Sequence, residues 1–192
     1  MKERGKIVSW VFILTAIIAF VFMAFPRTDG VETELNPVSY CEAETVTYYD
    51  VPIDRELQDE IRKICDSYNV DMPLVLAIIG QESNYDTSAI GDDGQSQGLM
   101  QIQQKWHSER MHKLGVTDLM NPRQNVTVGI DLLAELISEE KGWEWAVTAY
   151  NAGEAKADFH KTIGTRTEYT EDVMKLREDI EDESYIKESP LG

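Results

Sequence analysis

The sequence predicts a mostly α-helical protein with one globular domain, which we place at residues 54–181. The chain has 192 residues, of which 42% are hydrophobic, and this length suits a single domain with appendages. Several segments carry apolar residues at the i, i+3, i+4, i+7 spacing of an amphipathic helix. Residues typical of helix starts precede three of them, namely Asp54, Pro73 and the pair Asn121-Pro122. One helical domain with one hydrophobic core is therefore expected.

Six helices are expected in this domain, at about residues 54–68, 73–83, 104–114, 121–142, 143–151 and 168–181. Their apolar stripes consist of Leu57, Ile61, Ile64 and Cys65; Val75, Ile78 and Ile79; Trp106, Met111 and Leu114; Val126, Ile130, Leu133 and Ile137; Trp143, Val147 and Tyr150; and Tyr169, Val173, Leu176 and Ile180. The polar segment between residues 83 and 98 contains two glycines and predicts a loop. The sequence leaves open whether a short strand forms near Val46–Tyr49.

An apolar run precedes the domain. Residues 7–25 contain only Ser9 and Thr15 as polar members, and a helix of this length spans roughly 28 Å, close to the hydrocarbon thickness of a bilayer. Three basic residues lie before the run, which favours a cytoplasmic N-terminus. We therefore predict that residues 1–27 form a cytoplasmic tip and a single-pass membrane anchor, with the domain on the outer side. The alternative is a cleaved signal peptide and a secreted protein.

Residues 28–53 are acidic and polar and contain two prolines, which predicts an extracytoplasmic stalk. Residues 182–192 are expected to be an acidic tail. The whole chain has a formal net charge of −17, and the segment before the domain holds several of the basic residues. This charge argues against nucleic acid as a partner, because nucleic-acid binding requires basic patches. Substrate recognition must then come from a cleft and not from the overall field.

The chain offers no metal motif and implies no cofactor. His107 and His112 lie on different faces of their predicted helix, so metal ligation by this pair is not expected. Cys41 and Cys65 either pair in an oxidising compartment or are unrelated thiols, one of them buried in a helix. Asn125 begins a glycosylation sequon, which we interpret as chance because the following valine belongs to an apolar stripe.

Glu82 is the candidate catalytic residue. It follows the apolar run Leu74–Ile79 and shares a helical face with members of that run. Desolvation on such a face and the negative end of the helix both raise the pKa of a carboxyl group, which suits a proton donor near neutral pH. The alternative is a glutamate at a frayed helix end that points into water.

Three motifs occur in order along the chain: Glu82-Ser83, then Gly98-Leu99-Met100-Gln101-Ile102, then Ala149-Tyr150-Asn151-Ala152-Gly153. Together they resemble the lytic transglycosylase domain with the goose-type lysozyme-like fold, over roughly residues 60–178. The resemblance implies a fold of the lysozyme-like α+β superfamily. It also implies cleavage of the β-1,4 bond between N-acetylmuramic acid and N-acetylglucosamine in a peptidoglycan glycan strand, with a 1,6-anhydro product end.

The same resemblance assigns roles to these residues. Glu82 would act first as general acid and then as base, and Tyr150 would place its hydroxyl against Glu82. Ser83 would bind near the acid and the sugar, and Gly98 would allow a close backbone approach. Met100, Gln101 and Asn151 would line the cleft. The alternatives are core packing for Tyr150 and gap filling for Met100. The tryptophans at 106, 143 and 145 could stack on sugars, but aromatic residues in helices are more often core residues, so we place them outside the site.

The sequence leaves three functions open. Lytic transglycosylases need one catalytic carboxyl, whereas ordinary glycosidases use two. Asp86, Asp92 or Asp93 could supply a second carboxylate, which would give a hydrolytic muramidase of the same fold. The third function is a non-catalytic, wall-binding component of a secretion or conjugation machine.

Overall fold

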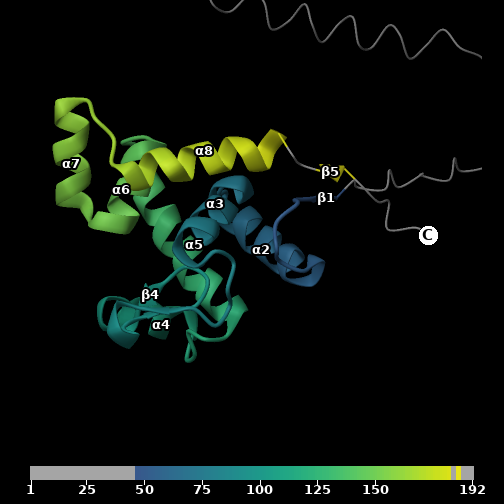
Figure 1. The fold of residues 1–192 in the computed structure, drawn as a ribbon. Helices are drawn as coiled ribbons and strands as arrows, with labels where there is room; N and C mark the ends of the chain where they lie inside the picture. Colours follow the sequence, from purple (N-terminus) through teal and green to yellow (C-terminus); the bar gives the residue numbers. More distant parts are fainter. Residues whose placement is uncertain (1–45, 183–184, 187–192) are drawn as a thin grey trace, which may run out of the picture. The chain divides into compact units, whose positions relative to one another are not determined.

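The computed structural model describes residues 46–182 and 185–186 of the chain. The predicted anchor at residues 7–25 and Cys41 lie outside these residues. Within the described part, no helix is both long and apolar enough to cross a membrane. The described residues form one mostly helical unit (Figure 1), which confirms the predicted fold class.

The α-helices are α2 (Arg55–Tyr68), α3 (Met72–Ser83), α4 (Gln104–Leu114), α5 (Pro122–Ser138), α6 (Trp143–Ala152), α7 (Glu154–Ile163) and α8 (Glu168–Asp182). All six predicted helices are present. Four begin at side-chain caps: Asp54 accepts from the Leu57 N–H at 2.8 Å, Asp71 from the Leu74 N–H at 3.2 Å, Asn121 from the Gln124 N–H at 3.1 Å, and the Thr167 hydroxyl from the Thr170 N–H at 3.2 Å. These bonds satisfy N–H groups that the first turn of a helix leaves without a partner.

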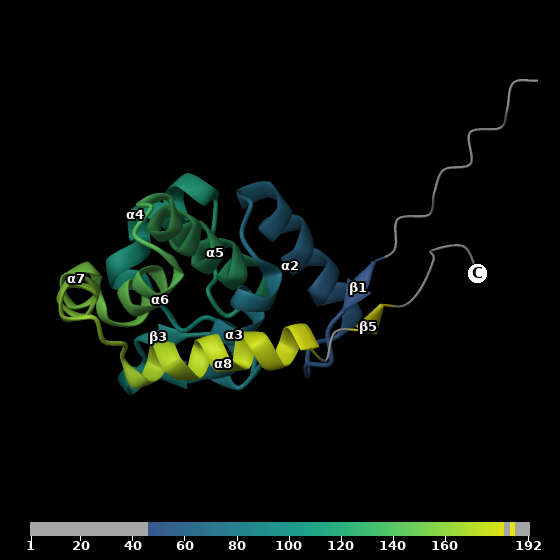
Figure 2. The same cartoon turned by 90° about the horizontal axis from the view of Figure 1, so that it is seen from above.

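Helix α7 was not predicted from the sequence. Its residues are almost all exposed, and Ala157 is its buried member. A helix that buries one small side chain shows no apolar stripe in its sequence. It is held instead by packing against α6, which both views show beside it (Figures 1 and 2).

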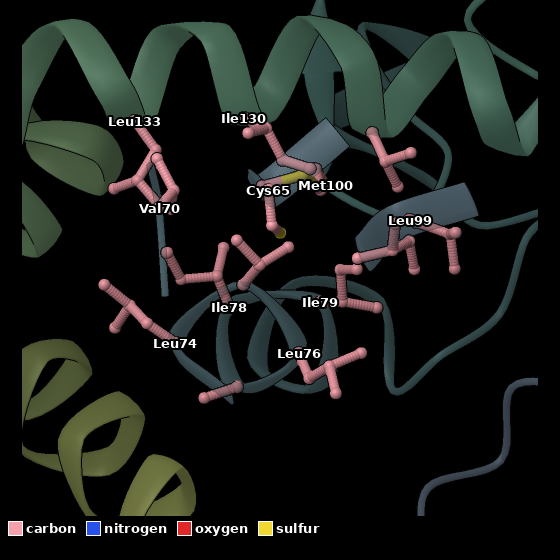
Figure 3. Packing of buried hydrophobic residues seen from close by; sticks show 14 of the residues in the cluster. Cys65, Val70, Leu74, Leu76, Ile78, Ile79, Leu99, Met100, Ile130 and Leu133 are labelled. Atoms are coloured by element: carbon pink, nitrogen blue, oxygen red, sulfur yellow. The ribbon is translucent and has the colours of Figure 1, made fainter. Parts of the chain in front are cut away.

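Helix α3 lies at the centre of the core. Its residues Leu74–Ile79 have no exposed surface, as expected for a helix that is apolar on all sides. Figure 3 shows Ile78 and Leu74 of α3 facing Ile130 and Leu133 of α5. Burial of each such side chain contributes roughly 1.5–3 kcal/mol, so the end of α3 is fixed firmly in place.

Helix α8 packs along the other side of α3 (Figure 2). A β-carbon at Gly80 would lie 2.8 Å from Leu176 Cδ2 of α8 and 2.8 Å from the Tyr85 hydroxyl. The absence of a side chain at Gly80 therefore permits the close approach of these two helices, just before the turn that carries Glu82.

The predicted loop after α3 contains a small antiparallel sheet, β2 (Ile90–Gly91), β3 (Ser96–Gln97) and β4 (Ile102–Gln103), in that order. A turn of 3-10 helix, Asp92–Gly94, joins β2 to β3. Polar strands of two residues give no alternating pattern, so the sequence predicted only a loop. The three strands follow one another along the chain between α3 and α4, and they add the β component of the fold.

The chain before α2 is also part of the folded unit. Strand β1 (Thr47–Tyr48) pairs with β5 (Tyr185–Ile186), and Ile53 is buried. The Gln58 carboxamide donates to the carbonyls of Tyr49 and Ile53 at 3.0 and 3.2 Å. The last residues of the predicted stalk and part of the predicted tail thus belong to the domain.

Cys65 of α2 is buried and carries a free thiol. Burial raises the pKa of this thiol to about 12, so it stays protonated and unreactive at neutral pH.

Candidate active site

A cleft of about 870 Å³ lies where α3 ends. Its walls come from the β2–β4 sheet, the start of α4, one side of α5 and the junction of α6 with α7. The lining includes Glu82, Asp92, Gln101, Tyr150 and Asn151. Residues that lie far apart in the sequence therefore converge on one hollow of the size that holds a substrate.

Glu82 occupies the last turn of α3 and is half-buried in the cleft wall. Its Oε1 accepts a 2.6 Å hydrogen bond from the hydroxyl of Tyr169. Burial raises the pKa of Glu82 above its ordinary value, the hydrogen bond from Tyr169 opposes this rise, and the charge of Asp92 adds to it. The predicted rise in the Glu82 pKa is confirmed in direction, and burial is its main cause.

Tyr169 was not predicted as a site residue. It lies in the first turn of α8 and is separated from Glu82 by 87 positions in the sequence. Burial and the neighbouring Glu82 charge raise the pKa of its phenol far above the ordinary value, so the group stays a hydrogen-bond donor. Packing of α8 on α3 brings the two side chains together, and no local sequence pattern predicts that contact.

The contact predicted for the Tyr150 hydroxyl is wrong. Its hydroxyl donates to the backbone carbonyl of Met100 at 2.8 Å and not to Glu82. Tyr150 still lines the cleft beside Glu82, and burial together with the Glu82 charge raises its pKa. The residue therefore ties α6 to the turn that precedes β4, and Tyr169 has the position next to the acid.

Met100 is fully buried and lies outside the lining of the cleft. Figure 3 shows it in the apolar layer between α3 and α5, with Leu99 beside it. A β-carbon at Gly129 of α5 would lie 2.3 Å from the Met100 sulfur. The side chain fills a gap in the core, so the prediction that it contacts the glycan is wrong.

Two further motif residues have roles inside the fold. The Ser83 hydroxyl donates to the carbonyl of Ile79 at 3.0 Å, within its own helix, and Ser83 is not among the residues lining the cleft. Gly98 has φ +70°, and a β-carbon there would lie 2.7 Å from the carbonyl oxygen of Leu119. Another part of the protein chain, the Leu119 carbonyl, thus makes a close approach to Gly98.

Gln101 and Asn151 line the cleft. The Gln101 carboxamide donates to the carbonyl of Gly98 at 2.9 Å and to that of Ala89 at 3.3 Å. These bonds hold its carboxamide against the β2–β3 hairpin and fix its orientation. Asn151 is exposed near the end of α6.

Asn125 was excluded as a glycosylation site and has a structural role that the sequence did not reveal. It is fully buried. Its Oδ1 accepts from the Met100 N–H at 2.8 Å, and its Nδ2 donates to the carbonyls of Gln97 and Leu119 at 2.7 and 2.9 Å. One carboxamide thus holds both ends of the Gly98–Gln101 turn.

Replacing Asn125 by alanine is expected to lower the free energy of unfolding by about 2–4 kcal/mol, since three backbone groups lose their partner and two of these bonds are buried. Urea denaturation measures this change. Thr127→Ala, on the same helix, is the control, because its hydroxyl only bonds back to the Arg123 carbonyl. Equal unfolding midpoints for the two variants would contradict the role of Asn125.

Asp92 is the acidic loop residue that lines the cleft with Glu82. Its Oδ2 accepts from the Ser96 hydroxyl at 2.6 Å and from the Gln103 carboxamide at 2.8 Å. Asp86 is exposed and bonded to Ser88, and Asp93 is exposed. Of the three candidates for a second carboxylate, Asp92 is therefore the one that lines the cleft with Glu82.

The tryptophans differ in their surroundings. Trp145 is buried, and its Nε1 donates to Asp158 at 2.9 Å, as predicted for a core residue. Trp143 is 42% exposed, and Trp106 is 74% exposed and lines the cleft. The interpretation of Trp106 as a core residue is wrong, because its position at the start of α4 points it away from the stripe that Met111 buries.

Comparison with known protein families identifies the family of this chain. Residues 59–172 match the family described as "Transglycosylase SLT domain". The chain belongs to the SLT transglycosylase family. The match covers α2 to the first part of α8, and so it includes Glu82, the sheet, the cleft walls and Tyr169.

Three individual proteins are similar to this chain over part of their length. The chain is 31% identical over 121 residues to the membrane-bound lytic murein transglycosylase F of Desulfosudis oleivorans, which covers 57% of this chain and 25% of that protein. The chain thus spans about a quarter of the length of this curated relative. The 70 kDa soluble lytic transglycosylase Slt70 of Escherichia coli has a similar fold, with a TM-score of 0.50 and 18% identity over 64% of this chain and 22% of that one. The lytic transglycosylase Slt of Pseudomonas aeruginosa aligns with a TM-score of 0.49 and 20% identity, over 64% of this chain and 22% of that one.

Proposed function

We propose that this protein is a peptidoglycan lytic transglycosylase that cleaves the β-1,4 bond between N-acetylmuramic acid and N-acetylglucosamine. One observation carries the proposal. Glu82, a half-buried carboxyl with a raised pKa, lies in a substrate-sized cleft and is oriented by the Tyr169 hydroxyl. Membership of the SLT family and the name of the curated relative support the substrate class.

The proposed reaction uses Glu82 twice. The protonated carboxyl first gives its proton to the glycosidic oxygen, and the departing N-acetylglucosamine leaves with that proton while the N-acetyl group of the muramic residue assists at the anomeric carbon. The Glu82 carboxylate then takes the proton of the C6 hydroxyl of the same muramic residue. The C6 oxygen bonds to the anomeric carbon, and the product carries a 1,6-anhydro end. A pKa above the ordinary carboxyl value suits a group that both gives and takes a proton.

The setting of the enzyme is part of the same proposal. The apolar run at residues 7–25, preceded by basic residues, supports a single-pass anchor with the domain outside the cell membrane. A curated relative described as membrane-bound agrees with this placement. An anchored wall-cutting domain would suit a secretion or conjugation complex.

The test is the chemistry of the products. Purified peptidoglycan sacculi digested with the full chain should release muropeptides that end in 1,6-anhydro-N-acetylmuramic acid. Mass spectrometry distinguishes these ends from reducing ends, because the two differ by the mass of one water. A parallel digest with a hydrolytic lysozyme supplies the reducing-end standard. Digests that contain no new ends of either kind would refute the proposed activity.

Asp92 favours a second candidate, hydrolysis by a muramidase of the same fold. A carboxylate held by Ser96 and Gln103 in the same cleft as Glu82 has the partners needed to orient a water molecule. Reducing ends in the digest, lost in the Asp92→Asn variant, would select this reaction. Anhydro ends from both the wild-type protein and Asp92→Asn would exclude it.

A further inference from the structure

The side chain of Trp106 is unusually exposed for an indole. It is 74% exposed, whereas Met111 of the same helix is buried and Leu114 is partly buried. Large aromatic surface in contact with water is costly when it has no partner, and aromatic side chains carry much of the binding energy of interfaces. An indole left open at the mouth of a cleft therefore indicates a surface that a ligand covers.

Trp106 lies where two hollows meet. It lines the cleft that contains Glu82, and with His107 it also lines a second hollow of about 440 Å³ on α4 and α5. Arg110 in this second hollow is fixed by ion pairs to Asp131 and Glu135. The shared residues make the two hollows neighbours along α4, so a chain-like ligand that leaves the cleft at this end passes Trp106.

The ring is also held in place. Lys105 Nζ lies 5.3 Å from the centroid of the Trp106 ring and donates to the Gln95 side chain, next to strand β3. This cation–π contact ties the indole to the sheet side of the cleft. A ring restrained in this way loses little freedom when a ligand covers it.

We propose that Trp106 is a stacking platform for a sugar ring, over which the glycan strand passes from the cleft into the second hollow. The C–H face of a pyranose is apolar and flat, and it can cover an indole while its hydroxyls reach polar neighbours such as Gln103 and His107. Stacking needs no charge, which matters for a chain of net charge −17 that must bind an anionic wall. This inference rests on the proposed function, since it assumes a glycan in the cleft.

Binding to size-fractionated, peptide-free glycan strands tests the platform. The full chain carrying Glu82→Gln serves as the parent, so that the strands are not cut, and isothermal titration calorimetry gives the affinities. Adding Trp106→Ala should weaken the binding of long strands by about three- to tenfold. The binding of a disaccharide, which covers less of the cleft than a long strand, should change less. Trp106→Phe should restore part of the loss.

Trp143→Ala is the matched control, because Trp143 is also exposed but lies outside both hollows; it should leave the affinities unchanged. Equal long-strand affinity for the parent and Trp106→Ala, with unchanged thermal unfolding, would overturn the platform while the cleavage activity of the wild type stands. A parent that binds no strand, together with a wild type that releases no product, would instead overturn the proposed function and the platform with it.

Discussion

Replacing Glu82 by glutamine is expected to lower the rate of peptidoglycan cleavage by about 10²–10⁴-fold, the range of a positioned general acid. Glutamine keeps the size of the side chain and can still accept from the Tyr169 hydroxyl, so only the proton to be transferred is lost. The release of soluble fragments from purified sacculi measures the rate, and mass spectrometry identifies the ends.

Glu168→Gln is the control, since Glu168 is exposed at the start of α8, one residue before Tyr169, and lies outside the cleft. It should cleave at the wild-type rate. Unchanged turnover in Glu82→Gln would remove Glu82 from the reaction. If the wild type and Glu82→Gln both bind the wall and neither produces new ends, the chain is the wall-binding component and not an enzyme.

Glu82→Gln should also change how the stability of the protein depends on pH. Burial raises the folded-state pKa of Glu82, so the wild-type protein loses stability as pH rises from the unfolded-state pKa of this group through its folded-state pKa. Glutamine cannot ionise and avoids that loss. Compared with the wild type, Glu82→Gln should therefore gain thermal stability near pH 7 relative to pH 4, which differential scanning calorimetry measures. A relative loss near pH 7 would mean that the folded protein favours the charged carboxylate.

Tyr169→Phe is the second substitution with a large expected effect. Losing the hydroxyl that orients Glu82 should slow cleavage by about 10- to 100-fold, on the scale of one positioned hydrogen bond. The bond from Tyr169 also lowers the pKa of Glu82, so its loss should raise that pKa further. Because the acid must be protonated to act, the alkaline limb of the pH profile of kcat/KM should move to higher pH.

Tyr150→Phe is the matched comparison. Its hydroxyl bonds to the Met100 carbonyl, so removing it should lower the free energy of unfolding by about 1 kcal/mol without moving the alkaline limb. A limb that moves in Tyr150→Phe and stays fixed in Tyr169→Phe would return the orienting role to Tyr150.

The sequence predicted those elements whose cause is local. Apolar spacing and capping residues are properties of neighbouring positions, and the helices that begin after Asp54, Asp71 and Asn121 follow them closely. Glu82 was found for the same reason, because its burial follows from the apolar helix that carries it. Helix α7 and the small sheet were missed because neither buries a stripe of its own.

The details of the site depended on contacts between distant segments. Met100 belongs to a recognisable motif, but whether its side chain faces the cleft or the core depends on the space left at Gly129 of another helix. Tyr169 looked like one more apolar position of α8, and its hydroxyl gained a role only through the packing of α8 on α3. Trp106 followed the helical spacing of a core residue and yet is exposed, since α4 buries little besides Met111.

The partner of Glu82 comes from the last helix of the described chain. During translation Glu82 leaves the ribosome well before Tyr169, and until α8 docks the carboxyl has no phenol to orient it and the apolar side of α3 has no cover. The surroundings of Glu82 are therefore complete only when α8 has been made and has docked on α3. A chain that stops before α8 would therefore carry the Glu82 carboxyl without the phenol that orients it.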